Sequence, residues 1–474
     1  MAMKKLQFSV EEENEEISFP PLSPVSAALT TSALSLSILP VLKFKVLINE
    51  ASLIEHLRNE IMPFNDRLSS MVHTDKKGVR RWRKVDFSVE DIVVIHAFPF
   101  GLSPEECEQH LEEYLSKIGT ERFSMDRPLW EVHMIKYPTA NGGGAVVFKF
   151  CHVIGDGYSL VSLLMKAFQR ADDPSLPLSF PNITLRSKIV RKINGFGFGF
   201  ALKCFNTISD VGAMLLRSSS WLKDHKTAVR SEKPVQEHLE PIVVSVITLP
   251  LEDIKQVKAK VEGSVNDVIT AIIHYAIHLY MFKKEEDFGG ERMTSLAMFN
   301  LRSFSGFNNI DEMVKAGIWG NRSITVPMPI PTFVPEKHID RDPLEFIERA
   351  KESMKRIRDS ALVQFTMPVV KMLNHMKGTE ALAELIYSIM KNSTTLVTNV
   401  IGPNEKMAMA GYPVGDFFYF VTGIPQSLVF TVISYMGSLK VVMTMEKGFI
   451  DSQVFTFCMN DAFQKIFQAA CAKD

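Results

Sequence analysis

The sequence has little cysteine and no excess charge of either sign. Its 474 residues include 53 lysines and arginines against 54 aspartates and glutamates, and only five cysteines. The net charge of -1 gives none of the overall basic field that is typical of nucleic-acid-binding proteins, so nucleic acid is not expected as a partner. No two cysteines form a CxxC pair, which argues against both a structural zinc site and a disulfide framework.

The sequence also lacks an uninterrupted hydrophobic run of the length that crosses a bilayer. Residues 17–42 are uncharged, but four prolines interrupt them, and acidic residues precede them where a signal peptide would carry positive charge. Residues 417–439 contain a Gly-Ile-Pro-Gln-Ser break between two runs rich in Phe, Val, Ile and Tyr, which predicts two buried strands joined by a turn. Residues 193–216 are apolar but contain four glycines, which favours contact with a bilayer surface over a span.

Four segments are distinguished along the chain. Residues 1–18 are acidic and without apolar periodicity, so we expect a disordered tail. Residues 19–173 alternate strand-like and helix-like patterns, and residues 242–474 resume this alternation. Between them, residues 174–241 lose the periodicity, which is typical of a linker or crossover. The sequence therefore predicts an α/β protein of two domains.

One turn carries the clearest sign of chemistry. A strand predicted over residues 145–150 runs into Cys151 and then into an H-x-x-x-D-G motif that begins at His152 and ends at Asp156 and Gly157. A histidine at a strand end can point into a cleft, and its ordinary pKa close to neutral suits a general base. Asp156 is expected to lock the turn by a buried ion pair, and Gly157 to let the backbone approach a substrate. The alternative is a purely structural role, with a buried histidine beside an ordinary Asp-Gly turn.

Other patterns favour structure over function. His274 and His278 lie four residues apart on a predicted helix, but no H-E-x-x-H pattern or third ligand accompanies them, so we predict packing and no metal site. The basic run at residues 76–84 could meet phosphate groups or anionic lipid, although a solvated loop is the favoured interpretation.

Short blocks in a fixed order accompany the H-x-x-x-D-G motif. They are PLSP at residues 21–24, RPLWEV at 127–132, VNDV at 265–268, NLR at 300–302, WGN at 319–321 and NVIGP at 399–403. With these blocks the chain resembles the plant bifunctional wax ester synthase/diacylglycerol acyltransferases over nearly its whole length. The resemblance implies the two-domain fold of CoA-dependent acyltransferases, which is chloramphenicol acetyltransferase-like, with mixed α/β sheets and a tunnel between the domains. Residues 242–474 would then be the C-terminal domain of that family.

The resemblance implies an acyl-CoA-dependent O-acyltransferase that esterifies long-chain fatty alcohols to wax esters and diacylglycerol to triacylglycerol. His152 would act as general base on the acceptor hydroxyl. Acyl-CoA would be a substrate, so no cofactor and no metal are expected. The implied partners are these lipids and a membrane surface, and the implied location is the cytosolic face of the endoplasmic reticulum membrane, with the plasma membrane as a second location.

The resemblance also implies roles outside the motif. Arg302 would pair with Asp156 across the domain interface, and Asn399 and Thr398 would lie near the oxyanion or the acyl chain. One departure from the family pattern affects the motif itself, because Cys151 stands where the family usually has a first histidine. A nucleophilic cysteine at this position is an alternative to base catalysis, although no group that would activate the thiol is identifiable.

Two other functions stay open. The first is a related acyltransferase with a smaller phenolic or amine acceptor, which the absence of the D-F-G-W-G motif of plant BAHD acyltransferases disfavours, since Gly415 leads only into Asp416 and Phe417. The second is a catalytically silent lipid-binding protein. The cysteine at position 151, in place of the usual histidine, is the reason to consider it.

Overall fold

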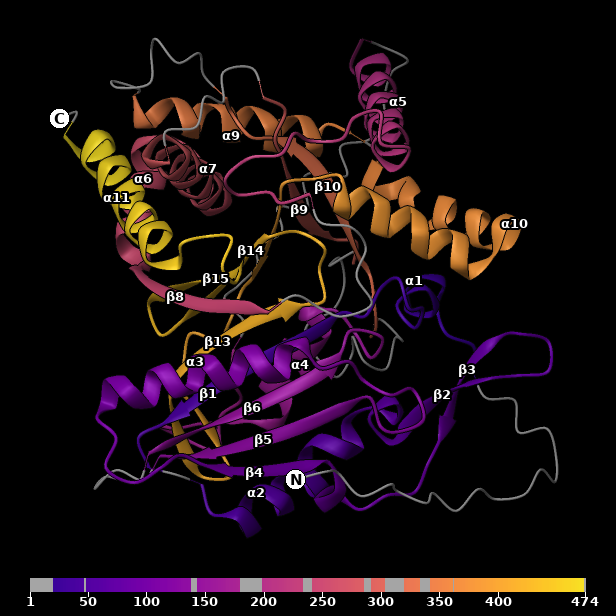
Figure 1. Ribbon diagram of the computed structural model, residues 1–474, viewed down its shortest axis with the longest axis vertical. Helices are drawn as coiled ribbons and strands as arrows, with labels where there is room; N and C mark the ends of the chain where they lie inside the picture. Colours follow the sequence, from indigo (N-terminus) through magenta and orange to yellow (C-terminus); the bar gives the residue numbers. More distant parts are fainter. Residues whose placement is uncertain are drawn as a thin grey trace.

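The chain folds into two lobes, each built on one sheet and lying against the other (Figure 1). The computed structural model describes residues 20–46, 48–137, 143–179, 198–232, 241–284, 291–302, 319–332, 342–360 and 362–472, apart from the side chains of 198–204 and 362–365. The acidic tail predicted at residues 1–18 lies outside the described residues. The predicted mixed α/β sheets and two-domain architecture are confirmed.

The first lobe is built on a mixed sheet of seven strands. The order is β4-β5-β6-β1-β13-β12-β7, with β4 parallel to β5 and all other neighbours antiparallel. The strands are β4 (Val93–Ala97), β5 (Trp130–Lys136), β6 (Gly144–Cys151), β1 (Ser37–Phe44), β13 (Tyr412–Thr422), β12 (Met407–Met409) and β7 (Gln169–Arg170). The strand predicted over residues 145–150 is β6, which is buried from end to end.

Helices and a hairpin surround this sheet. The helices are α1 (Pro24–Ala28), α2 (Glu50–His56), α3 (Pro104–Thr120) and α4 (Gly157–Ala167), and short turns of helix cover Leu57–Ile61, Met62–Phe64, Asp66–Ser69 and Val89–Ile92. The hairpin of β2 (Ser70–Thr74) and β3 (Arg80–Lys84) contains the basic run, in which Arg81 pairs with Asp75 at 2.7 Å and Arg80 pairs with Glu380 at 2.7 Å.

The second lobe is built on a mixed sheet of six strands. The order is β10-β9-β11-β14-β15-β8, in which β9, β11 and β14 are parallel. The strands are β10 (Ser323–Pro329), β9 (Thr294–Asn300), β11 (Thr395–Val400), β14 (Leu428–Tyr435), β15 (Ser438–Glu446) and β8 (Ile242–Pro250). Helices α6 (Leu251–Lys260), α7 (Val265–Lys283), α9 (Pro343–Arg358) and α11 (Ser452–Cys471) cover the face turned away from the first lobe (Figure 1).

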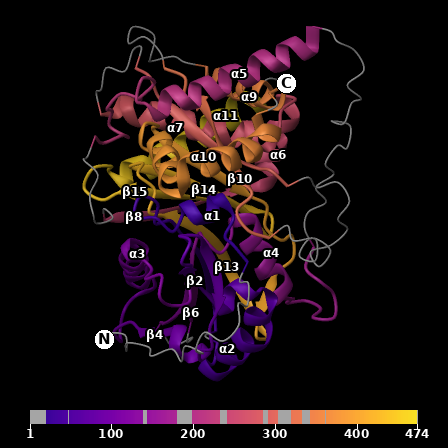
Figure 2. The same ribbon diagram turned by 90° about the vertical axis from the view of Figure 1, so that its right-hand side faces the viewer.

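Two further helices lie side by side at one edge of the second lobe, α5 (Phe198–Ser218) and α10 (Leu362–Lys391) (Figures 1 and 2). Helix α5 forms inside the segment that the sequence predicted as a linker. Helix α10 is interrupted at Gly378, where φ is 83°. Among the described residues one helix, α7, has the length and composition of a membrane span, but 78% of its apolar window is buried within the protein.

Strand β13 joins the two lobes. It pairs with β1 in the first sheet, whereas β14, which follows it in the chain, pairs with β11 and β15 in the second. The two strands expected in residues 417–439 are thus present, and the turn between them connects the two sheets. At Gly423 in this turn φ is 81°, and a Cβ would lie 1.9 Å from the carbonyl oxygen of Ser35, so the close approach requires glycine. The first sheet therefore draws strands from both predicted segments, 19–173 and 242–474.

Candidate active site

His152 lies where β6 ends and the turn toward α4 begins. The backbone N–H of His152 donates to the carbonyl oxygen of Leu36 at 2.9 Å, which ties the turn to the chain that enters β1. The side chain is half-buried, at the boundary between the lobes. The strand end therefore fixes the imidazole at the interface, which the predicted role requires.

Asn321, from the second lobe, orients the ring of His152. The two side chains meet at 2.9 Å between Nδ1 of the histidine and Oδ1 of the asparagine. The Asn321 amide nitrogen donates to the carbonyl oxygen of His152 at 2.8 Å, so its oxygen is the atom that faces the ring. Because an amide oxygen only accepts, Nδ1 carries the proton and the lone pair lies on Nε2. Nε2 is thus the atom able to take a proton.

The surroundings keep this ring neutral. Burial lowers the pKa of His152 below its ordinary value of 6.5, and this effect outweighs the opposite effect of the Asp156 carboxylate and of the Asn321 hydrogen bond. A neutral imidazole with a free Nε2 can act as a general base at pH 7.

The block of residues 21–24 supports Asn321 from the first lobe. Ser23 caps helix α1 and contacts the hydroxyl of Ser26 at 3.0 Å. Ser26 is 1% exposed, and its hydroxyl oxygen accepts a hydrogen bond from the Asn321 amide at 3.1 Å. Sequence reasoning missed Ser26 and Asn321 as functional residues. The only signal was that Asn321 belongs to the WGN block and that Ser26 follows the PLSP block.

Asp156 and Arg302 form a buried ion pair between the lobes. The guanidinium donates to both carboxylate oxygens at 2.8 Å, and each side chain is 1% exposed. Asp156 also caps α4 by accepting from the backbone of Ser159 at 3.1 Å, and it accepts from the hydroxyl of Ser323 at 2.8 Å. Burial alone would raise the pKa of Asp156, but Arg302 and these hydrogen bonds bring it below the ordinary value. Asp156 is therefore an ionised, fully engaged acceptor in this structure.

The WGN block packs against the same turn. Gly320 accepts from Arg302 at 2.7 Å, and the indole of Trp319 donates to the carbonyl oxygen of Ile154 at 3.0 Å. At Gly320 φ is 114°, a backbone conformation that favours glycine, and a Cβ would lie 2.6 Å from a guanidinium nitrogen of Arg67. The block thus holds the turn from the opposite lobe.

Gly157 lies under the end of β11. A Cβ at Gly157 would lie 3.3 Å from a methyl group of Val400, so a larger residue would require the Val400 side chain to shift slightly. Cys151 is 3% exposed, and burial raises the pKa of its thiol to about 11. A thiol in this state is a poor nucleophile, which disfavours the alternative of a covalent cysteine intermediate.

The structure separates the two residues that the resemblance places near the oxyanion. Thr398 and Asn399 are neighbours on β11, so they point to opposite faces of the sheet. Thr398 lies on the face of Leu396, toward the first lobe, with its hydroxyl 3.5 Å from that of Tyr419 on β13. Asn399 donates to the side-chain oxygen of Asn266 at the start of α7, at 2.7 Å. Its amide is thereby engaged with the helical side of the sheet.

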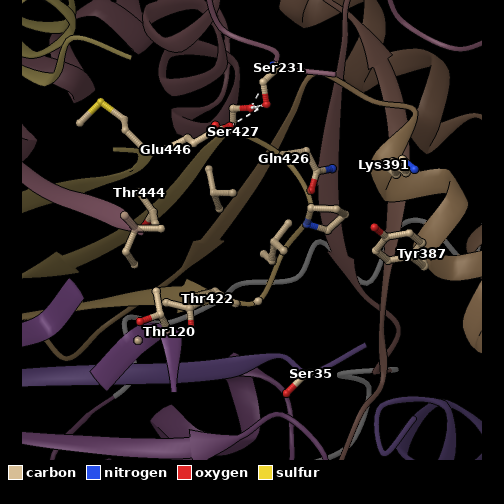
Figure 3. Close-up of a pocket in the computed structure, with 18 of the residues that line it drawn as sticks. Ser35, Thr120, Ser231, Tyr387, Lys391, Thr422, Gln426, Ser427, Thr444 and Glu446 are labelled. Atoms are coloured by element: carbon tan, nitrogen blue, oxygen red, sulfur yellow. Dashed lines mark hydrogen bonds between the residues drawn. The ribbon is translucent and has the colours of Figure 1, made fainter. Parts of the chain in front are cut away.

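A cavity of about 500 Å³ lies between the lobes, beside the turn that follows β13 (Figure 3). Ser37 of β1 pairs with Cys151 on one side and with Thr422 on the other, so the cavity wall at Thr422 lies at the same end of the sheet as His152. The described residues that line the cavity do not include His152 itself.

The walls of the cavity combine apolar and polar groups and carry an excess of positive charge. The amide of Gln426 and the hydroxyls of Thr422 and Thr444 are buried without a hydrogen-bond partner among the described residues. Such groups are costly to bury unless a ligand or water satisfies them. The charged side chains on the walls are Arg122, Lys223, Arg230 and Lys391 against Glu232 and Glu446.

The two histidines considered as metal ligands lie in the core of the second lobe. His274 is 1% exposed, and burial lowers its pKa to about 3. His278 packs against the ring of Phe346, with centroids 5.5 Å apart. Among the described residues no group of three or more His, Cys, Asp or Glu is arranged to hold a metal ion.

Comparison with known proteins identifies similar sequences along most of the chain. Residues 51–269 match the wax ester synthase/diacylglycerol acyltransferase catalytic domain, and residues 319–467 match the WS/DGAT C-terminal domain. The chain is 26% identical to wax ester synthase/diacylglycerol acyltransferase 3 of Arabidopsis thaliana, over 94% of this chain and 93% of the relative. It is also 26% identical to the Arabidopsis protein numbered 11, over 91% of each chain.

Solved structures share the fold at low sequence identity. The wax ester synthase/diacylglycerol acyltransferase from Marinobacter aquaeolei VT8 superposes with a TM-score of 0.60 at 13% identity, over 95% of this chain and 100% of that one. The first condensation domain of the calcium-dependent antibiotic synthetase, in complex with a substrate analogue, gives a TM-score of 0.60 at 13% identity, over 96% and 97% of the two chains.

Proposed function

The chain belongs to the wax ester synthase/diacylglycerol acyltransferase family and is an acyltransferase, and from this premise we propose that it transfers a fatty acyl group from acyl-CoA to a long-chain alcohol. The product is a wax ester, and diacylglycerol is the second acceptor, giving triacylglycerol. The observation that carries the proposal is the contact between Asn321 and Nδ1 of His152, which leaves Nε2 as a neutral proton acceptor at the lobe interface.

The proposed reaction is a direct transfer. Nε2 of His152 takes the proton of the acceptor hydroxyl while its oxygen attacks the thioester carbonyl carbon. The tetrahedral intermediate then collapses, the carbon–sulfur bond breaks, and the imidazolium returns the proton to the departing CoA sulfur. The lowered pKa of His152 keeps the ring neutral before the reaction and favours return of the proton to the departing sulfur.

Asp156 and Arg302 act in this proposal as positioning residues. Their pair connects the turn that carries His152 to the chain that follows β9 in the second lobe. A displacement of about 1 Å in a catalytic group can cost about a hundredfold in rate, so a rigid interface contributes directly to turnover. Of the two residues considered for the oxyanion, Thr398 is the better candidate because it faces the first lobe, whereas the Asn399 amide is engaged with Asn266.

The cavity between the lobes is the proposed binding site for the CoA part of the donor. The pantetheine arm carries two amides, which suit the unpartnered polar groups of Thr422, Gln426 and Thr444. Phosphate groups at the open side would meet Arg122 and Lys391. In this arrangement the thioester reaches His152 past the end of β1, through the tunnel that the resemblance implies.

The proposed location is the cytosolic face of the endoplasmic reticulum membrane, where long-chain alcohols and diacylglycerol partition. The four cysteines whose side chains the structure describes are free thiols, which is compatible with a reducing compartment.

Ester formation by the purified chain tests this function. Labelled palmitoyl-CoA is supplied with hexadecanol or with diacylglycerol, and the lipid products are separated and counted. We expect wax ester from the wild type and, for folded His152→Ala, a loss of at least about a hundredfold. Equal turnover by the folded variant would contradict the role of His152. If folded wild-type protein does not consume palmitoyl-CoA in the presence of either acceptor, the proposed substrates are wrong.

A further inference from the structure

Large apolar side chains are exposed on α5, just after its end and on α10. Seven of them are between 45% and 81% exposed, and we call them the α5–α10 face: Phe205, Ile208, Leu215, Leu216, Trp221, Met372 and Met376. The two helices lie side by side at the edge of the second lobe (Figure 2). An exposed apolar cluster of this kind on one surface is a sign of an interaction site.

The exposure follows from the helical period. On α5, residues 205, 208 and 215 fall on one exposed stripe, while Met214 lies nearly opposite and, like Val211, packs against buried clusters of the protein. Helix α5 thus carries apolar side chains both on its exposed stripe and on the side that described residues cover. Met372 and Met376 are one turn apart on α10 and form a matching stripe.

Two lysines flank the exposed methionines of α10. Lys371 precedes Met372 and Lys377 follows Met376, and residues 362–379 contain no aspartate or glutamate. On α5, the acidic Asp210 is paired with Arg356 at 2.7 Å. Methionines flanked by lysines, whose long stems can extend along an apolar surface, are suited to a bilayer with anionic headgroups.

A groove of about 300 Å³ separates the two helices. Its apolar lining comes from Leu215, Leu373, Leu382 and Leu385, and Lys377 and Glu384 also line it. Helix α10 also packs against α1, whose Ser26 contacts Asn321 beside His152. Helix α10 thus lines the groove on one side and contacts α1, beside the candidate active site, on another.

We propose that the α5–α10 face docks on an anionic lipid bilayer and that the groove between the helices takes up a hydrocarbon chain from it. This inference rests on the proposed function, because a long-chain acceptor must leave a membrane to reach His152. Apolar residues enter the region between headgroups and acyl chains, while Lys371 and Lys377 meet the phosphates. A second copy of the chain is the competing occupant of such a face.

Vesicle sedimentation with the full chain tests the docking surface. Phosphatidylcholine vesicles with and without phosphatidylserine are compared for the wild type, Ile208→Glu/Met372→Glu and the control Phe100→Glu, whose phenylalanine is 92% exposed on the first lobe. We expect wild-type binding that increases with phosphatidylserine, about a tenfold loss in the double variant, and no loss in the control. Lys371→Ala/Lys377→Ala is expected to lose mainly the increase with phosphatidylserine.

Three results would overturn the inference: a wild type that binds neither vesicle, a double variant that binds as well as the wild type, or a wild-type dimer in light scattering that Ile208→Glu dissociates. Activity on palmitoyl-CoA and hexadecanol dispersed in detergent micelles, without vesicles, separates this failure from failure of the proposed function. Wild type and Phe100→Glu are expected to form ester equally in micelles, whereas absence of ester even in the wild type would count against the proposed function instead.

Discussion

Two buried carboxylates with nearly the same chemistry serve different parts of the molecule. Asp156 is 1% exposed and pairs with Arg302 of the second lobe. Glu131 is 5% exposed and lies 2.9 Å from Lys149 and 3.3 Å from His133, both on strands of the same sheet in the first lobe. Burial would raise the pKa of Glu131, but His133 and Lys149 hold it down at about 2. Both clusters lie in blocks that resemble the family.

The difference shows that burial and ion pairing alone do not mark a residue that matters for turnover. Glu131 joins neighbouring strands β5 and β6, so its loss weakens one sheet. Asp156 joins two lobes at the turn that carries His152, so its loss changes the geometry in which the substrates meet. We therefore expect one substitution to affect stability and rate together, and the other to affect stability alone.

The largest effect is expected for Asp156→Asn. The change leaves Arg302 buried beside a neutral amide, which is expected to lower the free energy of unfolding by about 3–5 kcal/mol. Turnover per folded molecule is expected to fall at least about a hundredfold, because the His152 turn is no longer fixed. Thermal unfolding and ester formation measure the two effects. Asp416→Asn is the control, since its 2.8 Å pair with Lys440 is more exposed. Wild-type turnover in folded Asp156→Asn would contradict the expected difference between Asp156 and Glu131 in their effect on turnover.

Asn321→Ala tests how the second lobe contributes to the position of His152. The variant loses the acceptor at Nδ1, so the ring of His152 can rotate and change tautomer. We expect kcat to fall about tenfold to a hundredfold, with KM for acyl-CoA nearly unchanged. Steady-state kinetics on both substrates measure this. An increase in KM with unchanged kcat would mean that Asn321 binds substrate instead of orienting the base.

Glu131→Gln is expected to affect stability without affecting turnover. Lys149 is 2% exposed and would lose its charged partner, so the free energy of unfolding should fall by about 3 kcal/mol. Turnover of the folded fraction should equal that of the wild type. Urea unfolding and ester formation, each corrected for the folded fraction, test this. A drop in rate per folded molecule would show that the first sheet transmits its packing to His152.

The smallest expected effect is a change in stability at acidic pH. The folded pKa of Glu131 is about 2 against an ordinary 4.5, so its contribution is complete above pH 4.5 and is lost as the pH falls toward 2. The difference in stability between wild type and Glu131→Gln should therefore be about 3 kcal/mol at neutral pH and should shrink below pH 4.5. Unfolding across this range measures it. A difference that stays constant with pH would contradict ionisation of Glu131.

Much of the fold could be predicted from sequence because it depends on local patterns. The apolar run at residues 145–150 before H-x-x-x-D-G predicted β6 and the position of His152, and the break near Gly423 predicted two strands. The partners of those strands could not be predicted in this way. Periodicity shows that β13 is buried, but only the tertiary arrangement shows that it pairs with β1 in the other lobe.

The candidate site could also be predicted only in part. The H-x-x-x-D-G spacing identified His152 and Asp156, and family resemblance suggested Arg302, which the structure brings to Asp156 from 146 positions away. Asn321 escaped notice because its role arises only where it meets His152, 169 positions earlier. Asn399 is the opposite case. The resemblance suggested a place near the oxyanion or the acyl chain, but its side chain contacts Asn266.

The central claim is that His152 acts as a neutral base at Nε2 while Asn321 holds Nδ1. The most direct test is the pH dependence of kcat/KM for the wild type and for Asn321→Asp. Because burial lowers the pKa of His152, wild-type activity should fall with acid at a midpoint below pH 6.5. A carboxylate at Nδ1 would stabilise the imidazolium, so the midpoint of Asn321→Asp should move to higher pH. Identical midpoints in the two proteins would contradict the claim.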